Sequence, residues 1–170
     1  MVTEKGKNTL VVGVDGNFDD CQTAVKRMFA DEALNEEIGR KGFQFSSANS
    51  INIGRLVPQI VYYVYAYTRL LANEKINDGE KINVVVPTGN FGNILAGWFA
   101  KKMGLPVGKL ICASNANNVL TDFISTGTYD RNRPFYTTVS PSMDILVSSN
   151  LERLLFDVCG KDADYVSGLM

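Results

Sequence analysis

Residues 84–100 read VVVPTGNFGNILAGWFA, and this stretch decides the fold. An apolar run reaches Pro87, the uncharged sequence TGNFGN follows, and the chain then continues into an apolar pattern with helical spacing. This order predicts a buried strand, a tight turn and a helix. Units of this kind build parallel α/β sheets.

Similar patterns recur along the chain and predict the rest of the fold. We expect an α/β protein with a three-layer, mostly parallel sheet and helices on both faces. Residues 1–170 are expected to form a single α/β domain, in which residues 128–170 are an irregular segment with a terminal helix. The four tyrosines of the long helix are expected to pack rather than to react. The strands are expected at residues 9–14, 42–46, 81–86 and 109–114, and the helices at 21–29, 56–71, 93–104, 116–127 and 151–158.

Composition excludes several classes of function. The net charge of −1 argues against nucleic acid or an anionic membrane as a partner. The sequence has neither an apolar run of the roughly 20 residues that span a membrane nor a secretory signal pattern at its start. Three widely spaced cysteines are typical of reduced thiols. We therefore expect a cytoplasmic protein.

The chain contains no histidine. This absence excludes a Ser-His-Asp triad, a Cys-His pair and a histidine-ligated zinc ion within the chain. Any acid–base or covalent chemistry must use other side chains. No metal site is expected.

The neutral TGNFGN turn has the features of a phosphate-binding loop. Ligands of open parallel sheets bind beyond the carboxyl ends of the strands, where a helix start presents free N–H groups. Gly89 and Gly92 would let the backbone approach an anion, and either could adopt a positive φ. Thr88, Asn90 and Asn93 could add hydrogen bonds without adding charge. A simple strand-to-helix turn explains the pattern equally well, and neither a Walker loop nor GxGxxG is present.

A second junction serves as a contrast. Residues 10–18 read LVVGVDGNF, and Asp19 and Asp20 follow. These carboxylates, together with Asp15, would repel a phosphate, so we expect this helix start to be capped internally.

A polar cluster precedes the long helix in SSANSINIGR, residues 46–55. Asn49, Ser50 and Asn52 could converge there with Arg55, whose rigid fork suits phosphate or carboxylate. The alternative is a capped helix start with a surface arginine.

Four segments of the sequence resemble threonine synthase of the type found in bacteria and fungi. They are GNFDDCQTAVK, ANSINIGRLVPQIVYY, GNFGNILAGWFAKKMGLPV and SPSMDILVSSNLERLLF, and they follow the family's order. The resemblance implies a pyridoxal 5'-phosphate (PLP) enzyme of fold type II, a lyase of threonine biosynthesis. It implies conversion of O-phosphohomoserine and water to threonine and phosphate.

The resemblance also implies roles for particular residues. The family's loop for the cofactor phosphate matches Gly89, Asn90, Phe91, Gly92 and Asn93, which adjoin Thr88. The family's Asn-Ser-x-Asn-x-x-Arg stretch matches Asn49, Ser50, Asn52 and Arg55, which become candidates for the substrate's phosphate.

One family feature has no counterpart. The family binds its cofactor covalently through a lysine near a Phe-Lys-Asp motif, and none of the lysines at 26, 81, 101, 102 and 109 has that context. The resemblance therefore implies the central part of a longer enzyme, with the remaining segments of that enzyme as partners. We expect the chain alone to be inactive. Alternatives are a related fold type II PLP lyase or a non-catalytic phosphate-binding module.

Overall fold

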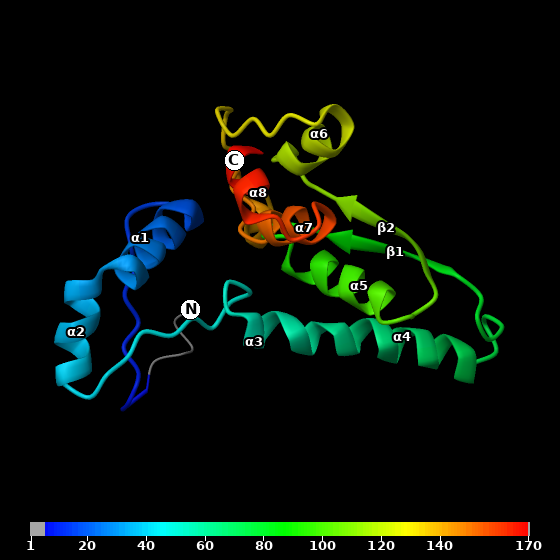
Figure 1. Ribbon diagram of the computed structural model, residues 1–170, viewed down its shortest axis with the longest axis horizontal. Helices are drawn as coiled ribbons and strands as arrows, with labels where there is room; N and C mark the ends of the chain where they lie inside the picture. The colour runs from blue at the N-terminus through cyan, green and yellow to red at the C-terminus, as the bar shows by residue number, and fades with distance from the viewer. Residues whose placement is uncertain (1–5, 170) are drawn as a thin grey trace. The chain divides into compact units, whose positions relative to one another are not determined.

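The computed structural model describes residues 6–169 (Figure 1). The chain divides into two compact units, one up to Phe45 and the other from Ser46 onward. The single domain expected over residues 1–170 stays a prediction.

The first unit contains two consecutive helices, α1 (Phe18–Ala30) and α2 (Glu32–Arg40). Asn17 caps α1, because its side chain accepts a hydrogen bond from the amide of Asp20 at 3.1 Å. Asp31 caps α2 by accepting from the amide of Leu34 at 2.9 Å. The sequence predicted α1, whereas α2 was missed.

The strands expected at residues 9–14 and 42–46 are wrong. The side chains of Leu10 and Val12 are 89% and 69% exposed. A strand exists only where a neighbouring backbone pairs with it. Within the described part of the first unit, the only pairing is an isolated bridge between Gly6 and Thr9.

The second unit contains a parallel sheet of two strands, β1 (Ile82–Pro87) and β2 (Val107–Ala113). Val86 pairs with Cys112 in the register. These strands confirm the α/β class and the parallel pairing that the sequence predicted. Val86 faces the core and is 3% exposed, whereas Val85 on the opposite face is 61% exposed.

The long helix of the second unit is interrupted where the sequence places Pro58. A 3-10 turn separates a short helix from the tyrosine-rich one, since proline lacks the N–H that an α-helix needs. Gly104 and Gly127 follow the ends of two helices and have positive φ, a conformation that suits glycine at a helix C-terminus. The last helix was not expected. In order, the elements are α3 (Ile53–Leu56), η2 (Val57–Gln59), α4 (Ile60–Ala72), α5 (Gly92–Lys102), α6 (Val119–Thr126), η3 (Pro141–Met143), α7 (Leu151–Val158) and α8 (Ala163–Leu169).

Helix α5 lies at the centre of the core of the second unit (Figure 1). Leu95 and Ala96 are fully buried. Helix α4 packs against α5 at Gly97, where a Cβ atom would lie 2.7 Å from the ring of Tyr63. Close packing fixes α5, and therefore fixes the loop that leads into it.

Among residues 6–169, no helix is long and apolar enough to cross a membrane. The same residues contain no group of side chains that could hold a metal ion.

Candidate functional site: an uncapped helix start

The loop between β1 and α5 has an unusual backbone at Phe91. This residue is the N-cap of α5 and adopts the left-handed conformation, with φ 60° and ψ 2°. That conformation costs a residue other than glycine roughly 1–2 kcal/mol. Gly89 and Gly92 do not have positive φ, so this part of the expectation is wrong.

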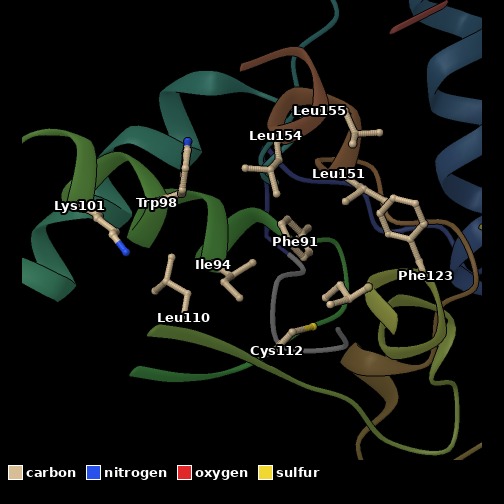
Figure 2. Close-up of a pocket in the computed structure, with 11 residues that line it drawn as sticks. Phe91, Ile94, Trp98, Lys101, Leu110, Cys112, Phe123, Leu151, Leu154 and Leu155 are labelled. Atoms are coloured by element: carbon tan, nitrogen blue, oxygen red, sulfur yellow. The ribbon is translucent and has the colours of Figure 1, made fainter. Parts of the chain in front are cut away.

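The ring of Phe91 accounts for the stability of this conformation. Its side chain is 6% exposed and belongs to the core cluster with Ile94 and Leu151. Figure 2 shows the ring at an apolar cavity of about 310 Å³, close to side chains of α5 and α7. Burying a phenylalanine contributes about 1.5–3 kcal/mol, which is enough to offset the backbone strain.

The backbone N–H groups of residues 89–94 are open, in the sense that they make no hydrogen bond within the described protein. None of these six backbone N–H groups has a hydrogen-bond acceptor among residues 6–169, and no side chain caps α5. Helix starts normally satisfy such groups with a capping side chain, water or a ligand. Consecutive free amides at the positive end of a helix dipole suit an anion.

The two glycines of the loop are explained by close approach of other segments. A Cβ atom at Gly92 would lie 2.6 Å from the Cβ of Ser50, and one at Gly89 would lie 2.8 Å from the backbone oxygen of Ser142. Ser50 and Ser142 line a cavity of about 190 Å³ together with the loop. The glycines therefore allow the segments that carry Ser50 and Ser142 to pack against the loop around this cavity.

Two predicted loop residues, Thr88 and Asn93, line the cavity, and their side chains are hydrogen-bonded to other parts of the protein. The amide of Thr88 donates to the oxygen of Ala113 at 2.9 Å, and its hydroxyl lies 2.7 Å from the sulfur of Cys112. Asn93 donates to Gln59 at 3.0 Å. Both residues fix the loop to its neighbours, which leaves the backbone as the main donor to an anion.

Tyr63, on helix α4, fixes the start of helix α5. Its hydroxyl lies 2.8 Å from both the backbone oxygen and the side-chain oxygen of Asn93. Burial raises the pKa of Tyr63 to about 12. The phenol is therefore neutral at physiological pH and donates to Asn93.

Only one residue of the 49–55 cluster lines the loop cavity. Ser50 does so, and its hydroxyl accepts from Asn150 at 2.9 Å, so its own hydrogen is available to a ligand. Asn49 and Asn52 instead accept from the amides of residues 51 and 54, and they shape the start of α3. Arg55 is exposed, and its guanidinium has no partner among the described residues.

Sequence reasoning missed the residues that join these segments, Asn150 and Arg153. Asn150 is fully buried and donates its side-chain N–H groups to the oxygen of Asn90 at 2.8 Å and to Ser50. Arg153 donates to the backbone oxygen of Ser50 at 2.7 Å and to that of Ile51. An asparagine before a helix with an arginine three residues later was the only available signal.

A buried carboxylate supports the other side of the cavity. Asp144 accepts from the amide and hydroxyl of Thr138 and from the side chains of Asn115 and Asn117. Burial raises its pKa, but these hydrogen bonds outweigh burial, so the pKa of Asp144 lies below its ordinary value. The network fixes the segment that places Ser142 next to the loop.

The donors present fit a phosphate group. Open amides, a serine hydroxyl and the absence of any carboxylate among the cavity-lining residues favour a dianion over a cation. The two glycines allow Ser50 and Ser142 to approach the loop closely, and both serines line the cavity with it.

Comparisons with known proteins show that the chain is similar to threonine synthases. It is 50% identical to threonine synthase-like 1 of Homo sapiens over 99% of its length and 45% identical to threonine synthase of Pseudomonas aeruginosa over all of it. It also matches a crystal structure titled PLP-bound threonine synthase from Brucella melitensis, with 46% identity and a TM-score of 0.71 over 91% of the chain. The chain is homologous to part of the threonine synthases.

The similarity covers only part of each relative. The chain spans 23% of the human protein, 34% of the Pseudomonas threonine synthase and 31% of the Brucella threonine synthase chain. No family model matches the chain. The resemblance to threonine synthase and the fold class predicted from the sequence are both confirmed, whereas the individual site residues stay predictions.

Proposed function

We propose that the loop at residues 88–93, with Ser50, holds the phosphate of PLP in a threonine synthase. The observation that carries this proposal is the run of six open amides at an uncapped helix start. The likeness to a structure titled PLP-bound threonine synthase supports it. Thr88 and the side chain of Asn93 fix the loop, and residues 89–94 contribute the backbone amides.

The proposed enzyme is a lyase that converts O-phosphohomoserine and water into threonine and phosphate. PLP supplies an electron-withdrawing ring that stabilises negative charge on the carbon atoms of the substrate. This chain's residues bind and orient: the amides of residues 89–94 hold the phosphate, and a held phosphate limits the movement of the ring. The segment from Ser140 to Asp144 closes the neighbouring side.

Arg55 remains our candidate for the phosphate of the substrate, with Asn49 and Asn52 shaping the turn before it. Its guanidinium is exposed and has no carboxylate partner among the described residues, so it is free to bind an anion.

We propose that the reaction takes place in the cytoplasm and requires segments of the enzyme beyond those described here. No lysine is among the described residues that line the loop cavity. A covalent attachment of the cofactor must then come from elsewhere in the enzyme.

Calorimetric titration of the chain tests the phosphate site. PLP and inorganic phosphate should bind to the same site and compete, while pyridoxal, which lacks the phosphate, should bind at least about tenfold more weakly. Equal affinity for pyridoxal and PLP would remove the phosphate role of the loop.

An activity assay tests the missing lysine. The chain supplied with PLP and O-phosphohomoserine should release no threonine, because nothing at the loop cavity replaces the covalent anchor. Threonine release above that of free PLP would show that this chain carries the anchor itself.

A further inference from the structure

No carboxylate among the described residues neutralises the charge of Arg153. Its side chain is half-buried, and its three hydrogen-bond acceptors are the backbone oxygens of Ser50 and Ile51 and the amide oxygen of Asn150. All three acceptors are uncharged. No described carboxylate lies within ion-pair distance of Arg153.

Two other cations of the second unit have carboxylate partners. Lys102 pairs with Asp157 at 2.9 Å, and Arg133 pairs with Asp122 at 2.7 Å. A partly buried cation normally has such a counter-ion, because removal from water is unfavourable for an unpaired charge. Arg153 stands out as a partly buried positive charge held only by dipoles.

Asn150 links this charge to the loop. Its side-chain oxygen accepts from Arg153 at 2.6 Å, and its side-chain nitrogen donates to the oxygen of Asn90 at 2.8 Å. The backbone amide of Asn150 donates to the same oxygen at 3.1 Å. The chain of hydrogen bonds therefore runs without interruption from the guanidinium to the peptide group between Asn90 and Phe91.

The oxygen of that peptide group, on Asn90, accepts hydrogen bonds from Asn150. Its N–H, on Phe91, is one of the open amides of the loop. In a trans peptide the N–H points opposite to the C=O, so the N–H of Phe91 points away from Asn150. Donation to the Asn90 oxygen polarises the peptide and makes its N–H a stronger donor. The positive charge of Arg153 acts in the same direction, since it attracts an anion held at the loop.

We propose that Arg153 is a positioning residue that supplies, through Asn150, the positive charge that the loop itself lacks. It does not touch the anion; it raises the affinity of the Asn90–Phe91 amide for a dianionic group. This inference rests on the proposed function, because it requires that the loop binds a phosphate. It explains how a loop without a lysine or an arginine can retain a doubly charged ligand.

The test measures anion binding to the whole chain by calorimetry, with sulfate as a dianion and methanesulfonate as a monoanion of similar shape. Arg153→Gln should lower sulfate affinity about tenfold and methanesulfonate affinity by clearly less. Arg153→Lys keeps the charge without the planar fork, so it should stay within about threefold of the parent chain. Glu152→Gln, an exposed neighbour on the same helix, is the matched control and should change neither affinity by more than about twofold.

A loss of affinity that is equal for the two anions would overturn the proposal, because a merely structural role loosens the loop for both. So would an Arg153→Lys chain as weak as Arg153→Gln. If Arg153→Gln does not fold by circular dichroism, the lysine variant decides: a sulfate preference like that of the parent supports the charge, and its loss refutes it. A parent chain that binds neither anion rejects the phosphate-binding loop itself, and this inference with it.

Discussion

The sequence Gly-Asn-Phe stands at two helix starts, and the two starts are built differently. At residues 16–18 the helix is closed: Asn17 accepts from the amide of Asp20, and Asp20 accepts from the amide of Asn17 at 2.9 Å. At residues 89–91 the helix has no side-chain cap, and its amides are open. The acidic start was predicted to be capped internally, and that prediction is confirmed.

The difference lies in the backbone as well as in the charge. Asn17 is the N-cap of α1 in an extended conformation, whereas in the neutral loop Phe91 is the N-cap in the left-handed conformation and the helix begins one residue later. An asparagine at the N-cap covers the free amides, while a phenylalanine cannot. The same tripeptide therefore forms a helix N-terminus that is capped by side chains at residues 16–18 and one with unpaired amides at residues 89–91.

The largest expected effect comes from Phe91, which sustains the open start. Phe91→Ala removes the buried ring and should lower the free energy of unfolding by about 3 kcal/mol. Phe91→Gly removes the same ring but relieves the left-handed strain, so it should be more stable than Phe91→Ala by about 1 kcal/mol. Urea denaturation of the two variants measures the difference. Glycine is usually the worse residue in a helix, so an alanine variant more stable than the glycine variant would contradict the strained cap.

The next largest effect is expected from adding a carboxylate to the neutral loop at residues 88–93. Gly89→Asp places a carboxylate where the loop meets Ser142 and should weaken phosphate and PLP binding about 100-fold, through repulsion and through contact with a backbone oxygen. Calorimetry of the variant chain measures this loss.

Gly39→Asp is the control for that substitution, because a Cβ atom at Gly39 has open space around it. It should leave the affinity within about twofold of the parent value. Unchanged binding in Gly89→Asp would show that the anion site lies elsewhere.

The smallest effect is expected from removing the N-cap of helix α1 at Asn17. Asn17→Ala should destabilise α1 by about 1 kcal/mol, and Asn17→Asp should restore the cap. Hydrogen exchange of the α1 amides reports the loss. Phosphate affinity should not change in either variant, and a parallel fall in affinity would mean that the two helix starts are not independent.

The fold was predictable where local pattern and pairing agree. The strands at residues 82–87 and 107–113 and the helix between them were expected, because a buried apolar run and a helical pattern alternate there. The apolar run at residues 9–14 is similarly rich in valine but lacks a partner strand in the described part of its unit. Composition states that a segment can form a strand, but pairing decides whether it does.

The site was predictable only in its local part. The loop at residues 88–93 was found from neutral charge and glycine spacing, yet the reason for the glycines is the approach of Ser50 and Ser142 from distant parts of the chain. Asn150 and Arg153 escaped detection because their partners at residues 50 and 90 are 60 to 103 positions away in the sequence. Contacts of that separation leave no periodic signal in the sequence.

A helix start without a cap also makes the stability of the second unit depend on its surroundings. Any anion that binds the folded loop and not the unfolded chain shifts the folding equilibrium by mass action. The stability of the second unit should then differ between a chloride and a phosphate buffer. We expect no such dependence at the start of α1, because Asn17 and Asp20 cap that helix themselves.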